Sequence, residues 1–136
     1  MFCRSLRHEG EELLGGVAGY PDFPWTSGIA LLHPWANRLA EFRYGDVALD
    51  PDSPDLYVLN GLPLHGLRSA VTGWEVLERT DTRLVAGREL DLPAFPFPHR
   101  IEVAADLSER ALTLTTTVTA RERPVPIAFG YHPYFR

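Results

Sequence analysis

Ala111–Ala120, with the sequence ALTLTTTVTA, is the stretch that decides the fold class of this chain. Its residues alternate with a period of two: Leu112, Leu114, Thr116 and Val118 fall on one face, and Thr113, Thr115, Thr117 and Thr119 on the other. This alternation of β-branched and aliphatic residues is typical of a half-buried β-strand. We therefore predict a strand with one face in a core and a threonine face in solvent.

The segments upstream predict antiparallel partners for this strand. Arg100–Leu107 also has strand character, and Ser108–Arg110 suits a short hairpin loop between the two. Gly73–Arg79 and Thr82–Leu90 form a second plausible hairpin, which turns around Thr80 and Asp81. Short strands that follow one another across tight turns favour an antiparallel sheet.

The distribution of proline and glycine extends this interpretation to the whole chain. Twelve prolines and eleven glycines leave few windows long enough for a helix. Leu92–Pro98 contains three prolines, at positions 93, 96 and 98, so this segment is expected to be a connection or an edge and not a central strand. No repeat or linker divides the sequence. We predict one domain over residues 1–136, an all-β antiparallel β-sandwich.

Composition and charge exclude several classes of function. The chain is 45% hydrophobic and 23% charged, as expected of a globular protein with a core. Its formal net charge is -5, and all 13 basic residues are arginines, without a basic stripe. This argues against nucleic-acid binding, and the lack of lysine argues against Schiff-base chemistry and a P-loop.

Cysteine and hydropathy patterns indicate the compartment. Cys3 is the single cysteine, so no internal disulfide framework or C-x-x-C motif exists. Charges interrupt Met1–Glu9 before an apolar signal-peptide core can form, and no stretch approaches the ~18 apolar residues of a membrane span. We expect a cytoplasmic protein with no membrane partner.

Three segments combine turn residues with side chains suited to chemistry: Leu32–Leu39, Gly61–Leu67 and His132–Phe135. His132 lies among aromatic residues, and its ring can exchange a proton near neutral pH. His65 precedes a glycine, where the backbone can approach a ligand closely. Arg38 offers a fork of donors for vicinal hydroxyls. Taken singly, each has a structural alternative: a core histidine, a turn histidine and a carboxylate-paired arginine.

Together the three segments resemble the aldose 1-epimerase (galactose mutarotase) family. That family carries Pro-x-x-Asn-Arg, then Leu-His-Gly followed by a Trp, then His-Pro-Tyr-Phe. Here these are Pro34–Arg38, Leu64–Gly66 with Trp74, and His132–Phe135, in the same order. The resemblance extends over essentially the whole chain.

The resemblance implies a galactose mutarotase-like supersandwich that interconverts the α and β anomers of a free aldose, without metal or organic cofactor. By analogy His132 is the general acid at the ring oxygen, and His65 assists there. Arg38, Asn37 and Tyr134 are the substrate-binding residues that it implies. Opening a hemiacetal requires a proton delivered at one oxygen and removed from another, which is consistent with these roles.

The sequence departs from the family pattern at its end. In relatives the general base, a glutamate, and a substrate-binding aspartate lie far downstream of the His-Pro-Tyr-Phe segment, in chains about twice as long. The resemblance therefore implies an N-terminal half of the fold, truncated and inactive alone.

Three alternatives stay open on the residues alone. The first is a sandwich that binds a carbohydrate without chemistry. The second is an epimerase for a hexose 6-phosphate, in which Arg43 or Arg68 would clamp phosphate. The third is a structural fragment with exposed sheet edges. A serine hydrolase is disfavoured because no G-x-S-x-G occurs, and a zinc site because no histidines stand at a close ligand spacing.

Overall fold

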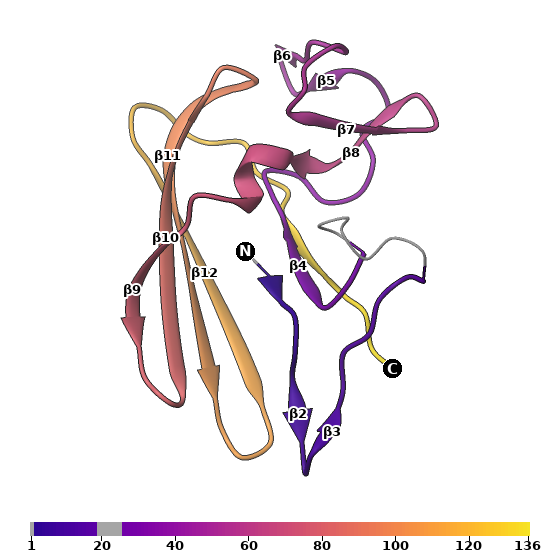
Figure 1. Cartoon of the computed structure of the whole chain (residues 1–136). Helices are drawn as coiled ribbons and strands as arrows, with labels where there is room; N and C mark the ends of the chain where they lie inside the picture. The colour runs from indigo at the N-terminus through magenta and orange to yellow at the C-terminus, as the bar shows by residue number, and fades with distance from the viewer. Residues whose placement is uncertain (1, 19–25) are drawn as a thin grey trace. The chain divides into compact units, whose positions relative to one another are not determined.

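A computed structural model of the chain describes residues 2–18 and 26–136 (Figure 1). Its contacts divide the chain into two compact units. Unit 1 comprises residues 1–72 and 126–136, and unit 2 comprises residues 73–125. We describe each unit by itself, and the expectation of one domain over residues 1–136 stays a prediction.

Unit 2 is one antiparallel sheet with the strand order β12-β11-β10-β9. Its strands are β9 (Glu75–Arg79), β10 (Arg83–Leu92), β11 (Phe95–Leu107) and β12 (Leu112–Ala120). Both predicted hairpins, β9 with β10 and β11 with β12, are present and antiparallel. The prediction of an all-β antiparallel fold is confirmed.

Burial in unit 2 alternates as the sequence predicts. Along β12 the residues from Leu112 to Val118 alternate between half-buried and exposed, with the threonines at odd positions exposed. In β11 the inward positions include Ile101 and Val103, both fully buried. Apolar side chains at every second position therefore build the core face of this sheet.

The structure extends a strand into the proline-containing segment Leu92–Pro98. Leu92 ends β10, and β11 begins at Phe95, five residues before the predicted start at Arg100. The prolines are tolerated because the ladder with β12 ends at His99↔Ala120, and of Phe95–Pro98 only Phe95 has a register partner in β10. The Pro98 carbonyl accepts a hydrogen bond from the Arg121 amide at 3.1 Å, which requires no amide hydrogen from proline. This part of β11 is an edge, as expected, although it belongs to a strand that is central further along.

Unit 1 consists of much shorter strands. Its three-stranded sheet has the order β1-β4-β13, and three two-stranded ladders join β2 to β3, β5 to β6 and β7 to β8. The bounds are β1 Phe2–Cys3, β2 Arg7–His8, β3 Glu11–Glu12, β4 Ile29–Leu32, β5 Arg43–Tyr44, β6 Val47–Ala48, β7 Leu56–Leu59, β8 Leu62–Leu67, η1 Arg68–Val71 and β13 Gly130–Pro133. The one helix among the described residues, η1, has four residues, and no described helix is long and apolar enough to cross a membrane.

β4 forms the centre of unit 1. All four of its residues, Ile29–Leu32, are buried, as expected of a strand that is covered on both faces. Ala36, Tyr57 and Val71 pack against Ala30 and Leu32. The strand that carries His132, β13, pairs directly with this buried strand, so the core fixes its position.

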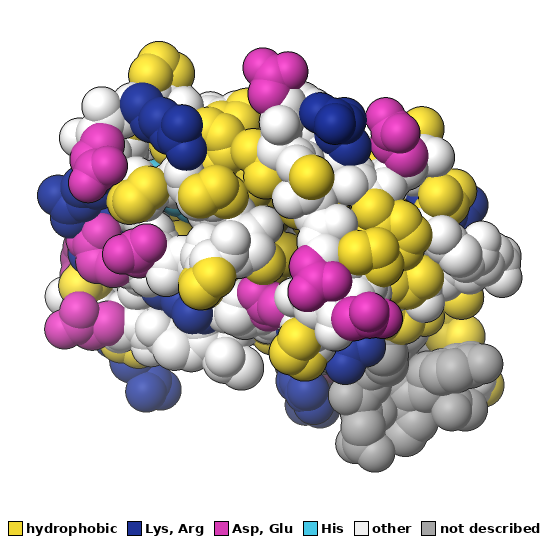
Figure 2. All heavy atoms as spheres, turned by 90° about the horizontal axis from the view of Figure 1, so that it is seen from above, with side chains coloured by type: hydrophobic (Ala, Val, Ile, Leu, Met, Phe, Trp, Pro, Cys, Tyr) yellow, Lys and Arg dark blue, Asp and Glu magenta, His cyan; other side chains and the backbone are white. Residues whose placement is uncertain are grey.

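Charged side chains of both signs are interspersed on the face shown in Figure 2. In unit 2 many of them form exposed ion pairs, for example Arg83 with Glu78 and Arg100 with Glu89, each at 3.1 Å. Exposed pairs of this kind contribute little to stability, typically below ~1 kcal/mol. Apolar burial, and not surface charge, therefore stabilises this sheet.

Candidate functional site

Two of the predicted site segments lie side by side in unit 1. Isolated bridges join His33 to Gly66 in parallel and Arg38 to Leu64 in antiparallel orientation. The Leu67 amide donates to the His33 carbonyl at 3.0 Å, and the His65 amide donates to the Asn37 carbonyl at 2.9 Å. Backbone bonds therefore hold His65 against the turn that carries Asn37 and Arg38.

The backbone at this junction has an unusual conformation. His65 and Asn37 have φ angles of 63° and 62°, in the left-handed region that residues with a Cβ seldom adopt. Gly66 follows with φ 81°, and a Cβ there would lie 2.0 Å from the His33 carbonyl oxygen. Only glycine fits this close approach. The glycine of the Leu-His-Gly motif is thus explained by the geometry of the junction.

β13 brings the third segment to the same place. His132 is the register partner of Ala30 in the buried strand β4. Its ring meets that of His65 edge-on, with centroids 5.5 Å apart and an interplanar angle of 79°. Two histidines 67 positions apart in the sequence are therefore neighbours.

The electrostatics of this pair fix the charge of one member. Burial lowers the pKa of His65 to about 4, and the nearby charges of His132 and Arg38 add to the shift. Each of these causes disfavours the imidazolium, the first by desolvation and the others by repulsion of a second cation. At neutral pH His65 is uncharged, with one ring nitrogen as donor and the other as acceptor.

His132 is held by a different contact. Its ring stacks on the ring of Tyr134, with centroids 4.5 Å apart and an interplanar angle of 20°. The Tyr134 backbone is fixed on both sides, because its amide donates to Gly28 and its carbonyl accepts from Gly15, each at 2.8 Å. The His132 Nδ1 atom is buried and has no hydrogen-bond partner among the described residues. The ring therefore has a fixed plane and spare hydrogen-bonding capacity.

The other predicted site residues lie around this pair. Asn37 and Arg38 are exposed, and Arg38 is close enough for its charge to act on His65. The Tyr134 ring contacts the His132 ring directly. All five predicted residues belong to unit 1, and their roles toward a substrate stay predictions.

A scan against protein-family models matches the aldose 1-epimerase family over residues 5–136. The chain belongs to the aldose 1-epimerase family. This confirms the resemblance drawn from the three motifs, and the β-rich structure is consistent with the β-sandwich of that family. A search of curated proteins finds no match, and neither does a search of solved structures.

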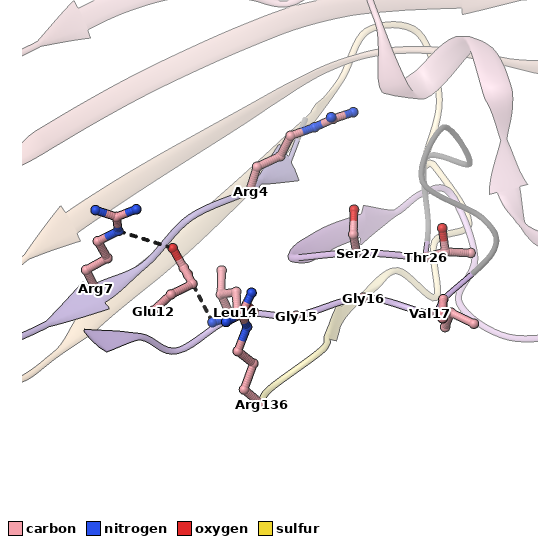
Figure 3. A pocket seen from close by; sticks show the side chains of 11 residues that line it. Arg4, Arg7, Glu12, Leu14, Gly15, Gly16, Val17, Thr26, Ser27 and Arg136 are labelled. Atoms are coloured by element: carbon pink, nitrogen blue, oxygen red, sulfur yellow. Dashed lines mark hydrogen bonds and ion pairs between the residues drawn. The ribbon is translucent and has the colours of Figure 1, made fainter. Parts of the chain in front are cut away.

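The described residues contain no cluster of three or more His, Cys, Asp or Glu side chains that could hold a metal ion. They do contain a pocket of about 640 Å³ in unit 1, and none of the five predicted site residues lines it (Figure 3). Sequence reasoning missed this pocket, for which the adjacent Gly15 and Gly16 were the only signal. It also gave no role to His33, a member of the Leu32–Leu39 segment, whose carbonyl lies against Gly66.

Proposed function

We propose that this chain carries the acid side of an aldose 1-epimerase site, a site that interconverts the anomers of a free hexose by acid-base ring opening once a base completes it. The observation that carries the proposal is the His65–His132 pair, with ring centroids 5.5 Å apart and Arg38 nearby. Family membership supports the reaction class. The substrate is a small neutral aldose, and the proposal requires no cofactor.

The two histidines have different roles, because they differ in charge. His65 is uncharged at neutral pH, with a pKa of about 4, so it serves as a neutral hydrogen-bond partner of the sugar ring oxygen. His132 then acts as the general acid that protonates this oxygen while the C1 hydroxyl loses its proton. Two imidazolium ions at this separation would repel each other, so His65 stays uncharged while His132 delivers its proton.

Asn37 and Arg38 lie on the exposed side of the junction and are suited to bind sugar hydroxyls. Arg38 presents planar donors to vicinal hydroxyls, and the amide of Asn37 supplies both a donor and an acceptor. Tyr134 holds the plane of the His132 ring by stacking on it. A cytoplasmic location remains part of this proposal, because the single thiol suits a reducing compartment.

The part of the chain that the structure describes supplies the acid without an evident base, since the groups that act on His65 are both cationic. We therefore propose that the isolated chain is a fragment. It binds an aldose but does not accelerate mutarotation above the buffer rate. Polarimetry of freshly dissolved α-galactose, with and without the purified chain, tests this. An acceleration that disappears in His132→Ala would instead show a complete enzyme.

Catalysis is tested in a chimaera, called the completed protein, in which this chain is followed by the downstream part of a relative. That part supplies the carboxylate base. His132→Asn should slow mutarotation there by a factor of about 100, the usual scale for a lost general acid. His8→Asn, in the exposed strand β2, is the matched control and should leave the rate unchanged. A parental rate in His132→Asn would remove His132 from the mechanism.

The isolated chain and the completed protein together distinguish a binding module from an enzyme. If galactose shifts the NMR signals of the His65 and His132 rings while the completed protein shows no catalysis, the site binds a sugar without chemistry. If galactose shifts neither ring in either protein, the site assignment itself is wrong.

A further inference from the structure

The pocket in unit 1 has an uneven distribution of charge. Its lining includes Arg4, Arg7 and Arg136, and Glu12 is the single acidic side chain among the described lining residues (Figure 3). The whole chain has a net charge of -5, so an excess of guanidinium groups in one hollow departs from the average surface. A positively charged hollow attracts anionic small molecules.

The negative charge of Glu12 offsets only one of these three guanidinium groups, and its two oxygens are already engaged. They accept hydrogen bonds from the Ser5 hydroxyl at 2.6 Å, the Leu6 amide at 2.9 Å and the Leu14 amide at 3.0 Å. These bonds, with that of Arg7, lower the pKa of Glu12 to about 2. Arg7 is its ion-pair partner at 3.5 Å. Arg4 and Arg136 therefore remain for a ligand.

Arg4 makes no ion pair with any described residue, and Arg136 uses only its Nε, which donates to the Leu14 carbonyl at 3.0 Å. This bond leaves the two terminal amino groups of Arg136 for a bidentate contact with an oxyanion. A Cβ on Gly15 would lie 3.2 Å from the Cγ of Arg136, so the glycine allows the arginine to lie close to the backbone. Ser27 adds a hydroxyl donor to the lining.

We propose that this pocket is an oxyanion site that binds the phosphate group of a small molecule through Arg4, Arg136 and Ser27. The volume of about 640 Å³ lies in the range of small-molecule pockets, and it exceeds what inorganic phosphate alone would fill. The pocket also adjoins the histidine pair through the backbone. Gly15 in its lining donates to the carbonyl of Tyr134, whose ring stacks on His132.

This assignment differs from the phosphate clamp that the sequence suggested. Neither Arg43 nor Arg68 lines the pocket, and the Arg68 guanidinium lies over the Tyr57 ring at 5.8 Å. The phosphate site stands on its own lining residues and does not depend on the epimerase proposal. Its two possible sources, free phosphate and a hexose 6-phosphate, share the oxyanion that the arginines bind.

The test is calorimetric titration of the purified chain with inorganic phosphate, galactose 6-phosphate and galactose, at one low ionic strength. We expect saturable binding of both phosphates. Arg4→Gln and Arg136→Gln should each weaken it at least about tenfold, because each removes a charge-assisted contact. Arg110→Gln, an exposed change of equal charge in unit 2, should change it less than twofold.

Tighter binding of galactose 6-phosphate than of phosphate would assign the anion to a sugar, and equal binding would assign it to free phosphate. Both results support the site. No saturable phosphate binding, or binding equally insensitive to all three variants, would overturn it. Arg136→Gln removes a bond to the backbone, so an NMR spectrum checks its fold, and Arg4→Gln decides alone if that variant unfolds.

Discussion

Units 1 and 2 differ in how their backbones are paired. In unit 2, β10 and β11 run 10 and 13 residues and pair along almost their whole length. In unit 1 the longest strand, β8, has six residues, and all five isolated bridges of the described chain lie there. The four described non-glycine residues with positive φ, Glu9, Asn37, Asn60 and His65, also lie in unit 1.

The difference shows where a binding site can be built. A long ladder satisfies its own backbone groups and places side chains at fixed alternate positions, so it is stable but uniform. The junction of His33–Leu39 with Pro63–Leu67 is held by single bonds between distant residues, which leaves side chains free to converge from different directions. The comparison predicts that local changes at this junction cost more than their size suggests.

Gly66→Ala should have the largest effect. The new Cβ would meet the His33 carbonyl oxygen at 2.0 Å while φ stays at 81°, so both the clash and the strained backbone oppose folding. We expect a loss of unfolding free energy on the order of 3 kcal/mol. Denaturant titration, followed by fluorescence of the tryptophans, measures it.

Gly61→Ala is the matched control for this change. Gly61 has a similar φ of 77°, but a Cβ there would meet nothing within 4 Å. It should cost only the backbone strain, roughly 1 kcal/mol. Equal losses for the two glycines would show that the close approach of Gly66 to His33 does not limit stability.

His65→Gln should have the next largest effect, visible in acid. The folded pKa of about 4 lies below the ordinary 6.5, so the unfolded chain binds a proton that the folded chain does not. Stability should therefore fall as pH drops below 6.5 towards 4, and be independent of this group above 6.5. After allowance for solvent screening, we expect a loss of about 1 kcal/mol between pH 7 and pH 5.

In His65→Gln this dependence on pH should become flatter by the same amount. His8→Gln in β2, whose side chain is exposed, should retain the parental dependence. Unfolding midpoints in urea at pH 7 and pH 5 give the comparison. A parental slope in His65→Gln would mean that the ring is not desolvated in the folded chain.

Much of unit 2 could be predicted from the sequence, because its signal is local. The period of two in Leu112–Ala120 depends on nothing beyond the strand itself, and the alternation of burial is observed. The start of β11 was missed because tolerance for Pro96 and Pro98 depends on where β12 ends, a tertiary fact that no local pattern contains.

The site in unit 1 was found through the order of its motifs and not through local physics. Nothing around His65 predicts its φ of 63°, and nothing in residues 130–136 predicts that His132 would meet it. The family resemblance carried that information. The arginine-lined pocket stayed hidden for the same reason, because Arg4 and Arg136 lie at opposite ends of the sequence.

The two edges of the sheet in unit 2 extend the comparison to association. Within the described residues, β9 and β12 each have a sheet neighbour on one side. β9 carries Glu75, Glu78 and Arg79, whereas the nine residues of β12 include no charge. Charged residues on an edge strand oppose pairing with another chain, and a long neutral edge invites it. We therefore predict that the isolated chain self-associates through β12.

Thr115→Lys tests this with the smallest expected change in fold stability. Thr115 is exposed, and its register partner on β11 is Ala104, so the new charge gains no ion pair across the ladder. The unfolding free energy should change by no more than about 0.5 kcal/mol, as for other surface positions. Association should nevertheless weaken, because pairing would bury the ammonium against a neighbouring strand.

Thr115→Val is the control, since it keeps the edge neutral and raises its β-propensity, and it should strengthen association. Light scattering after size exclusion, over a range of chain concentrations, measures both. If the parent chain is monomeric throughout, or if the lysine and valine variants associate equally, the edge of β12 does not govern association.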